Sequence, residues 1–467
     1  MSYKLLEGIR ILDLTMVFAG PIGSKILASL GAEVIKIESA MRCDVYTRAN
    51  VYPENEPGEE HWNRGCFFHS LNAGKYGISL NLGSEEGKEI FRRLVKISDV
   101  VIENFSPRVM ENWGLGYKDL KKIREEIIMV SLSGLGHYGP LRDFYMYVPG
   151  MEGMSGLMHM TGYPEEPPLL SGYAYGDWVL GTTGAAALLV ALYHRQRTGK
   201  GQYIDVAGRE AVISHIGEIV MDYTLNGREQ ARLGNHHSSS APHGCYRCKG
   251  HDQWVNVAVE NDEQWRRFCQ ALGYPSWTRE ERFAEASSRW RNQDELDRFI
   301  EEWTSQRDHY EVMEILQKAG VPAGAVLNMK EIHLDPQFVN RGFFEIIDHG
   351  EGVGERPILQ QIPAKFTEVE NFVPRRAPRF GQDNEYVVCT LLGMSKDDLK
   401  RLEDEKVVGG TPVFPPGRPT RVDLIEKQEA GWFDPDYLAE IRKRHGEDIG
   451  AYEAPPGEKR ESGTKHK

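Results

Sequence analysis

The sequence has 467 residues, of which 40% are hydrophobic and 27% charged, and its formal net charge at pH 7 is -13. This size predicts two domains, because a single core does not grow so large. The negative balance argues against nucleic acid or an anionic membrane as a partner, since both attract basic surfaces. The longest apolar run, residues 184–193, is too short to span a bilayer. Six scattered cysteines and a start without an export signal indicate a cytoplasmic protein.

The first forty residues alternate between strand and helix. Residues 9–15 form an apolar run typical of a buried strand, residues 18–30 begin with a glycine turn and continue as a helix, and residues 31–38 give the next strand. This is a βαβ unit. Its turn lacks the full Gly-x-Gly-x-x-Gly pattern, so a dinucleotide site is not predicted.

The same alternation continues, with strands at 76–82, 99–103 and 127–133 and a helix at 85–97. It predicts an α/β fold with a parallel sheet covered by helices. Such sheets bind ligands at the carboxyl ends of their strands. Residues 104–108 directly follow a strand end and offer a phenylalanine ring for stacking and an arginine for phosphate. A loop ring packed on the core is an equally good interpretation.

Asp177 stands directly before a run of small and apolar residues that predicts a buried helix. A carboxylate at a helix start is held by free backbone NH groups and by the helix dipole, which keep it ionised. The same features suit a carboxylate nucleophile, which must be ionised, positioned and poorly solvated. From the local residues alone, the helix cap is the better interpretation.

Beyond that helix the pattern changes. Residues 197–201 end the helix, 202–206 form a strand, and a helical stretch at 209–225 leads to a polar loop at 233–244 that marks a domain boundary. Strands at 245–249 and 254–259, followed by helices from residues 263, 293 and 310, predict a smaller α+β domain. Residues from 395 onward are rich in charge, proline and glycine, and 453–467 are predicted to be disordered.

Cys245 and Cys248, with His236, His237 and His243 nearby, raise the question of a metal site. A structural zinc site normally has a second cysteine pair at regular spacing, and this sequence has none. A plain strand through the two cysteines is therefore preferred, and no metal is predicted.

Nine motifs in order resemble the family III CoA-transferases of the CaiB/BaiF type, which include formyl-CoA, carnitine and benzylsuccinate CoA-transferases. The likeness covers about residues 5–393. The motifs are residues 6–15 with 19–21, 30–38, 103–107, 155–158, 172–177, 197–202, 320–324, 335–336 and 362–363.

The resemblance implies a Rossmann-like large domain with a smaller α+β domain, and two ring-shaped chains interlocked as a dimer. On this plan residues 1–200 begin the large domain, 201–232 form a linker and helix, and 233–328 form the small domain. Residues 329–394 return to the large domain, and 395–467 are a C-terminal extension.

The resemblance also implies a covalent mechanism on Asp177. Its carboxylate attacks an acyl-CoA, giving a mixed anhydride and CoA thiolate. The thiolate then attacks the aspartyl carbonyl and leaves an enzyme-bound CoA thioester, and a free carboxylic acid reverses both steps. Tyr147 matches a tyrosine of the transferases. The CoA thioester is a substrate, and no permanently bound cofactor is expected.

Further implied contacts belong to the CoA moiety. The basic residue that the family often has after the second strand is replaced by Ser39, and Arg42 is its substitute. Residues 236–242 match the family's mobile covering loop but lack its glycine run. The residues implied to contact CoA are Val17, Phe18, Ala19, Arg42, Lys75, Asn104, Phe105 and Arg108.

Two alternatives stay open. An α-methylacyl-CoA racemase would share the scaffold and Asp177 but needs a histidine where this chain has Tyr147, and a phenol with a pKa near 10 is a poor base there. Glu260 does fall where racemases place a further acid. The chain could also be a non-catalytic CoA-binding subunit of a heteromer, although its intact Asp177 and Tyr147 argue against this.

Overall fold

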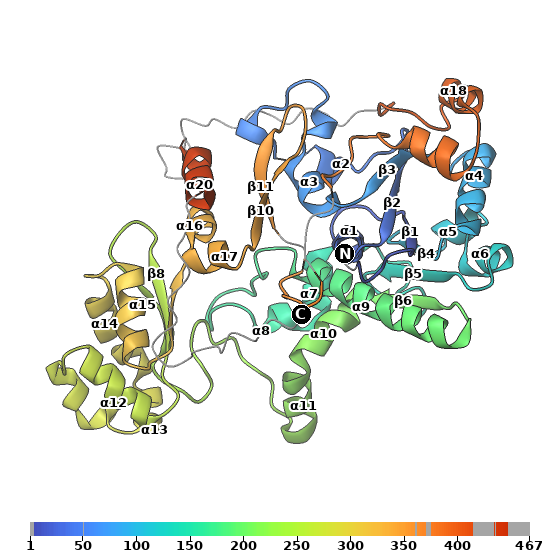
Figure 1. Ribbon diagram of the computed structural model, residues 1–467. Helices are drawn as coiled ribbons and strands as arrows, with labels where there is room; N and C mark the ends of the chain where they lie inside the picture. The colour runs from blue at the N-terminus through green and yellow to red at the C-terminus, as the bar shows by residue number, and fades with distance from the viewer. Residues whose placement is uncertain are drawn as a thin grey trace, which may run out of the picture. The chain divides into compact units, whose positions relative to one another are not determined.

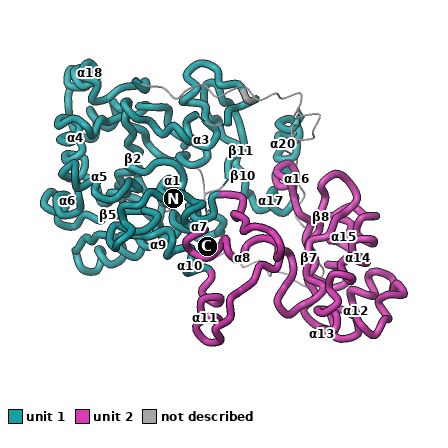
Figure 2. The backbone as a smooth tube through the Cα atoms, turned by 180° about the vertical axis from the view of Figure 1, so that it is seen from behind, with its two compact units in different colours: residues 1–152, 174–215, 333–467 teal, residues 153–173, 216–332 magenta. Residues whose placement is uncertain are grey.

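The computed structural model describes residues 4–49, 51–359, 362–369, 375–413, 434 and 436–446. The chain divides into two compact units (Figure 2). Residues 1–152, 174–215 and 333–467 form the larger unit, and residues 153–173 and 216–332 form the smaller one. The smaller unit thus starts before the predicted boundary at 233. It also takes in residues 153–173, because Arg232 donates to the carbonyls of His159 and Tyr163.

The larger unit contains a sheet of six parallel strands (Figure 1). Their order is β3-β2-β1-β4-β5-β6. The connections therefore reverse direction between β1 and β4, as in a Rossmann-like doubly wound sheet. The strands are β1 (Arg10–Asp13), β2 (Glu33–Glu38), β3 (Tyr76–Ser79), β4 (Val100–Glu103), β5 (Ile128–Ser133) and β6 (Tyr203–Ala207). The predicted α/β fold is confirmed.

Successive strand residues enter two different cores, as the two-residue repeat of a strand requires. Ile11 and Val100 face one core, while the neighbouring Leu12 and Val101 face the other. Helices α1 (Ala19–Ser29) and α9 (Tyr175–Thr198) cover the first face. Helices α4 (Glu85–Lys96), α6 (Tyr117–Ile123) and α18 (Lys396–Asp404) cover the second. The sheet is the middle layer of three.

Helices α1 and α9 approach each other closely because glycines lie between them. A Cβ atom on Gly181 would lie 2.3 Å from the carbonyl oxygen of Ala19, and one on Gly23 would lie 2.7 Å from that of Gly181. Among the described residues, α9 is the one helix that is long and apolar enough to cross a membrane by composition. Half of its apolar stretch is buried, and it packs on α1, β5 and β6, as a core helix does.

The smaller unit is built around an antiparallel sheet of β7 (His243–Arg247), β8 (Trp254–Ala258) and β9 (Ala323–Val326). Helices α12 (Asp262–Ala271), α14 (Gln293–Thr304) and α15 (His309–Lys318) supply the rest of its core. The α+β character of this unit agrees with the prediction. Its third strand was not predicted, because Ala323–Val326 is short and rich in small residues.

Three other segments differ from the predictions. The stretch at 209–225 is broken into α10 (Gly208–Ile213), a 3-10 turn and α11 (Gly217–Asn226). A hairpin of β10 (Phe344–Asp348) and β11 (Glu355–Leu359) was not predicted. The supposed C-terminal extension starts inside the core, where Leu402 and Val408 are buried, and continues to α20 (Tyr437–Gly446). The predicted disorder of 453–467 lies outside the described residues.

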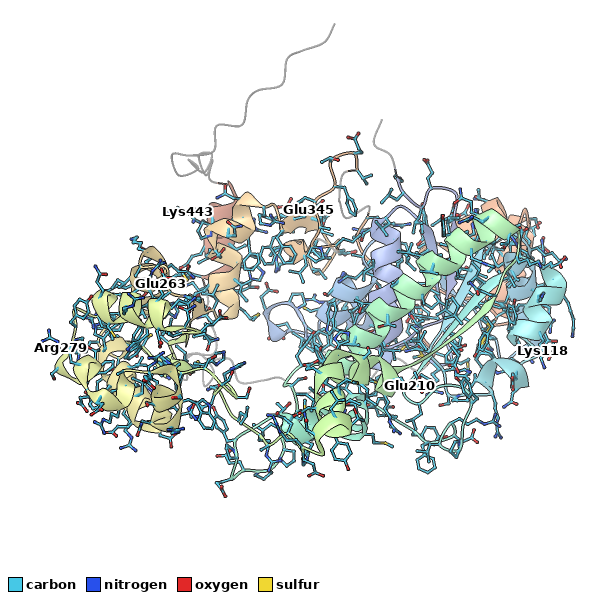
Figure 3. The ribbon with its side chains drawn as sticks, turned by 90° about the horizontal axis from the view of Figure 1, so that it is seen from below. Lys118, Glu210, Glu263, Arg279, Glu345 and Lys443 are labelled. Atoms are coloured by element: carbon cyan, nitrogen blue, oxygen red, sulfur yellow. The ribbon has the colours of Figure 1, made fainter. Side chains whose placement is uncertain are left out.

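Charged side chains lie mainly on the outside of both units. Figure 3 labels Lys118 and Glu210 on the larger unit and Glu263 and Arg279 on the smaller one, and all four are exposed. Several charged residues of the larger unit are instead buried in or beside its sheet. They are Asp13, Lys36, Glu38, Arg48, Lys75 and Glu103.

Replacing Gly181 by alanine should lower the free energy of unfolding by about 1–3 kcal/mol, because the new methyl group overpacks the α1–α9 contact. Gly217→Ala is the matched control. Gly217 begins α11, and a Cβ atom there meets nothing within 4 Å. That substitution should leave stability unchanged or raise it by up to about 1 kcal/mol. Equal effects of the two changes in urea unfolding would contradict the close packing.

Candidate active site

A cavity of about 550 Å³ lies at the carboxyl ends of the strands in the larger unit. It sits where the sheet order reverses, between the turn that follows β1 and the segment that follows β4. Ligands of doubly wound sheets bind at this point. The structure brings together eight of the ten predicted site residues, all of which line this cavity: Val17, Phe18, Ala19, Arg42, Asn104, Phe105, Tyr147 and Asp177.

Two predicted contacts with CoA do not line the cavity. Lys75 is completely buried, and its ammonium group donates to the carboxylate of Asp13 at 2.9 Å and to the side chain of Asn72 at 2.8 Å. Arg108 points its guanidinium at Asp143, 2.8 Å away, and is half exposed. In this structure Lys75 is an internal partner of Asp13 and is not available to a phosphate.

Asp13 is the centre of a buried polar network beneath the cavity. Its carboxylate accepts hydrogen bonds from Thr15, Ser24 and Lys75, and Lys36 donates to the carbonyl of Thr15. Burial alone would raise the pKa of Asp13, but the adjacent Lys75 and Lys36 hold it well below its usual range. Burial lowers the pKa of Lys75 to about 8. The network fixes the end of β1, from which the cavity wall continues.

The turn after β1 is strained and tied down. Val17 has a φ of 65°, a left-handed conformation that is rare for a β-branched residue. Its amide donates to the carboxylate of Asp44 at 2.9 Å. The side-chain amide of Asn104 accepts from the Met16 amide and donates to the Met16 carbonyl, both at 2.8 Å. Asn104 therefore holds the cavity wall through Met16, in addition to lining the cavity itself.

Asp177 lies in the first turn of α9, one face of which lines the cavity. The prediction that Asp177 caps this helix is wrong, because α9 begins two residues earlier, at Tyr175, and has no side-chain cap. No described residue donates a hydrogen bond to its carboxyl group. Burial raises the pKa of Asp177 to about 7, so the expectation of a stably ionised group is also wrong. The carboxyl is poorly solvated and titrates near neutrality.

Tyr147 lies at the start of α7 (Val148–Ser155), where its carbonyl accepts from the amides of Gly150 and Met151. Its side chain is 67% exposed. Met151 then packs where Gly176 and Gly208 leave room, since a Cβ on Gly208 would lie 2.2 Å from the Met151 sulfur. This packing brings the segment that carries Tyr147 beside the residue that precedes Asp177.

A buried polar cluster next to the cavity was not predicted. Burial raises the pKa of Glu103 to about 7, and the His137 ring lies 3.8 Å from its carboxylate. The amide of His137 donates to Asp205 at 2.8 Å, and Phe105 donates its amide to Glu103 at 2.7 Å. In the sequence, Glu103 is only the first residue of the motif at 103–107. Its burial depends on strands β5 and β6, which the sequence around it does not reveal.

Arg142 is a second residue that sequence analysis did not single out. Of the residues that line the cavity, Arg42 and Arg142 are the two cations. A lone arginine in a polar segment is usually a solvated charge. Only the fold of residues 134–151 identifies Arg142 as part of the cavity wall.

The remaining predicted residues lie in the smaller unit. His236, at the start of the predicted covering loop, contacts Asp297 at 2.7 Å. Glu260 is exposed before α12 and donates its amide to Gln264. Cys248 is buried in the core, whereas Cys245 is half-buried. The described residues contain no group of three or more histidine, cysteine or acidic side chains arranged to hold a metal.

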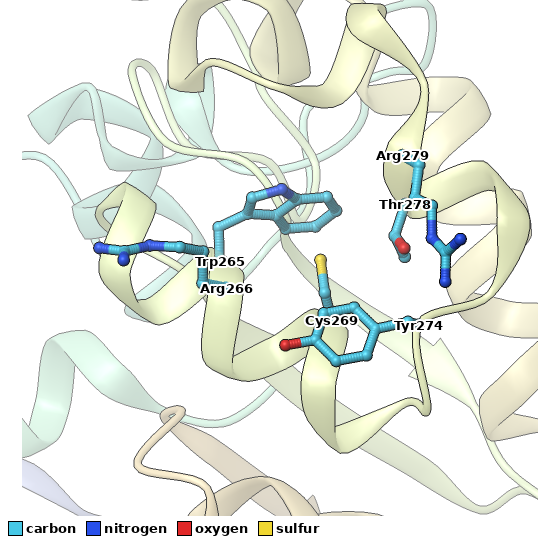
Figure 4. A pocket seen from close by; sticks show the side chains of 6 residues that line it. All are labelled: Trp265, Arg266, Cys269, Tyr274, Thr278 and Arg279. Carbon is cyan, nitrogen blue, oxygen red and sulfur yellow. The ribbon is translucent and has the colours of Figure 1, made fainter.

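The smaller unit has a shallower cavity of about 430 Å³ (Figure 4). The Cys269 thiol points toward the Trp265 ring, and Arg266 extends away from Tyr274. Burial raises the pKa of the Cys269 thiol to about 11, so this thiol is not reactive at neutral pH. None of the predicted site residues lines this cavity.

Comparison with known proteins identifies the class to which this fold and site belong. The sequence profile of CoA-transferase family III matches residues 6–384. The chain is 33% identical over 404 residues to the succinyl-CoA–D-citramalate CoA-transferase of Chloroflexus aurantiacus, covering 86% of this chain and 98% of that protein. It is 32% identical to the alpha subunit of the succinyl-CoA–L-malate CoA-transferase of Chloroflexus aurantiacus, covering 86% and 92%.

A solved structure agrees. The crystal structure of a CaiB/BaiF family protein from Brucella suis superposes with a TM-score of 0.74 at 34% identity, covering 83% of this chain and 99% of that one. The chain belongs to CoA-transferase family III. It is therefore an enzyme that transfers CoA between acyl-CoA thioesters and carboxylic acids.

Replacing Asp177 by asparagine should stabilise the protein above neutral pH. The pKa of Asp177 is raised from 3.8 to about 7 on folding, so between these pH values the unfolded state ionises first and the stability of the wild type falls. Asparagine avoids this loss. The gain should be absent near pH 4 and reach at most roughly 4 kcal/mol above pH 7, at ~1.4 kcal/mol per pKa unit.

Urea unfolding of both proteins from pH 4 to 8 measures this difference. Asp119→Asn, at a more exposed carboxylate on α6, is the control and should show no such pH dependence. A gain for Asp177→Asn that is the same at every pH would contradict the raised pKa.

Proposed function

We propose that Asp177 is the nucleophile of a covalent CoA transfer. The observation that carries this proposal is a half-buried carboxyl, to which no described residue donates a hydrogen bond, in the wall of the cavity at the sheet's switch point. Burial raises its pKa to about 7. A carboxylate that no donor stabilises attacks a carbonyl more readily than a solvated one, and the pKa keeps a large fraction ionised at neutral pH.

The proposed reaction has four steps. The Asp177 carboxylate bonds to the acyl carbonyl, the C–S bond breaks, and a mixed anhydride and CoA thiolate result. The thiolate attacks the aspartyl carbonyl and releases the donor acid, leaving an aspartyl-CoA thioester. The acceptor carboxylate displaces CoA from this thioester to form a second anhydride. Finally the thiolate attacks the acceptor's carbonyl and frees Asp177.

The rest of the cavity wall is suited to this chemistry. The free backbone NH groups at the start of α1 lie beside α9, because Gly181 touches Ala19, and they are suited to stabilise negative charge on a carbonyl oxygen. Phe18 and Phe105 offer rings against which the CoA moiety could pack, and Arg42 offers a cation for phosphate. Tyr147 adds a hydroxyl on the side of Asp177.

We also propose that the exchanged acids are dicarboxylic. Both relatives named above are described as acting with succinyl-CoA and a second dicarboxylic acid, citramalate or malate. The cavity of this chain adds a cation, Arg142, that such acids could use. A racemase is not favoured, because the family match and the relatives are CoA-transferases and because Tyr147 replaces the histidine base.

Asp177→Ala should reduce the rate of CoA transfer by at least about 10³-fold, because no other group in the wall replaces the nucleophile. CoA binding, measured by calorimetry, should change by less than about threefold. Asp119→Asn serves again as the control with normal activity. Residual transfer by Asp177→Ala at more than a tenth of the wild-type rate would overturn the assignment.

We propose that the chain acts as a cytoplasmic homodimer. None of the ten residues of α11 is buried, and Val220, Met221, Tyr223 and Leu225 are exposed on it. A helix with this many exposed apolar side chains normally packs against another chain. One of the relatives is the alpha subunit of a CoA-transferase, so a heteromer is the competing arrangement.

The purified chain alone should transfer CoA from succinyl-CoA to a dicarboxylic acid and should have twice the monomer mass by light scattering. Val220→Glu combined with Leu225→Glu should shift it toward the monomer, because two charges cannot be buried cheaply in an apolar contact. Activity that is absent alone and restored by a related subunit would contradict the homodimer.

A further inference from the structure

We propose that Arg142 binds the second carboxylate of a dicarboxylic substrate, and so makes the enzyme select dicarboxylic over monocarboxylic acids. This inference rests on the proposed function, since it names the group that recognises the acid bound at Asp177. It goes beyond that function by assigning specificity to one residue.

The two cations of the cavity come from segments that follow different strands. Arg42 follows β2, and Arg142 belongs to the segment that follows β5. In the sheet, β2 and β5 are separated by β1 and β4, which makes three strand spacings or about 14 Å. The proposal assigns the two arginines to different parts of the ligand.

Asp177 is carried by α9, which packs on α1 and on β5, the strand that precedes Arg142. Helix α9 packs on β5 and β6, and the Leu132 side chain of β5 fills the space that Gly184 of α9 leaves open. The segment after β5 folds back on itself, since Met146 packs against both Gly134 and Gly150. In the proposal the acyl group lies on the β5 side of the cavity with Arg142, and the CoA phosphates lie with Arg42.

No residue that the structure describes accepts a hydrogen bond from the guanidinium of Arg142. Its nearest carboxylate is Asp143, at 3.7 Å from Nε, which is beyond hydrogen-bond distance. Asp143 is already engaged by Arg108 at 2.8 Å. Arg108 and Arg142 therefore share the carboxylate of Asp143. A planar guanidinium with free donors is suited to bind a carboxylate through two parallel hydrogen bonds.

Apolar side chains lie between these charged groups. The cavity wall around Arg142 and Asp177 includes Phe144, Met146, Met151 and Leu180. They provide a surface for the methylene groups of an acid whose one carboxyl reacts at Asp177 while the other is held by Arg142. A monocarboxylic acid of the same length would leave the arginine without this partner. A hydrogen-bonded charge pair of this kind corresponds to about 10- to 100-fold in kcat/KM.

The test uses isotope exchange between an acyl-CoA and its own labelled acid, so that donor and acceptor are the same compound. Succinyl-CoA with labelled succinate is compared with butyryl-CoA and labelled butyrate, which has the same number of carbons. The proteins are the wild type, Arg142→Gln, Arg142→Lys and the control Arg92→Gln on the surface of α4. The KM for CoA thioester and the thermal midpoint are measured for each.

The wild type and Arg92→Gln should prefer succinate. Arg142→Gln should lower kcat/KM for succinate about 10- to 100-fold and for butyrate less than about threefold. Arg142→Lys keeps the charge but loses the paired donors, so its loss for succinate should be intermediate. If Arg142→Gln does not fold, the ratio of kcat/KM for succinate to that for butyrate in Arg142→Lys tests the inference instead.

An equal loss for both acids would mean that Arg142 serves the CoA moiety, and it would overturn the inference. An unchanged ratio would overturn it as well. In both cases the wild type still exchanges CoA and the proposed function stands. A wild type that exchanges neither acid would instead refute the function and the inference together.

Discussion

The buried pair of Asp13 and Lys75 is the interaction on which the site depends. Asp13 ends β1, Lys36 lies in β2, and Lys75 directly precedes β3, so the network links three neighbouring strands. Removing either partner would leave an uncompensated buried charge, which proteins tolerate poorly. The turn from Met16 to Ala19 directly follows this network, which therefore anchors the strained backbone of the turn. The cavity is thereby formed before any ligand binds.

The larger unit contains two carboxyl groups with opposite pKa shifts, and their neighbours explain the difference. Asp13 is fully buried, but two lysines and two hydroxyl groups hold its pKa low. Asp177 is less buried, no described residue donates a hydrogen bond to its carboxyl group, and desolvation raises its pKa. The first arrangement makes a permanent anion that supports the fold. The second makes a carboxyl that is reactive when ionised, as the proposed chemistry requires.

The sequence predicted the sheet well because parallel strands buried on both faces are continuous apolar runs, and such runs are visible locally. It failed where the decisive partner is distant. Lys75 was predicted to contact CoA, because its actual partner, Asp13, lies 62 residues earlier. Asp177 looked like a cap because Tyr175 and Gly176 resemble a loop, although tertiary packing of Met151 on Gly176 extends the helix through them. Arg142 was missed for the same reason, since only the folding of residues 134–151 brings it to the cavity.

Transfer of an oxygen atom from the acceptor acid to Asp177 tests the proposed covalent path. In the proposed sequence of steps, the acceptor acid leaves one of its own carboxylate oxygens on Asp177 in every turnover. After turnover with acceptor labelled by ¹⁸O on both carboxylate oxygens, mass spectrometry of the peptide that contains Asp177 should find the label in that carboxyl group. Transfer that proceeds while Asp177 stays unlabelled, or that labels a different carboxyl group, would contradict the account.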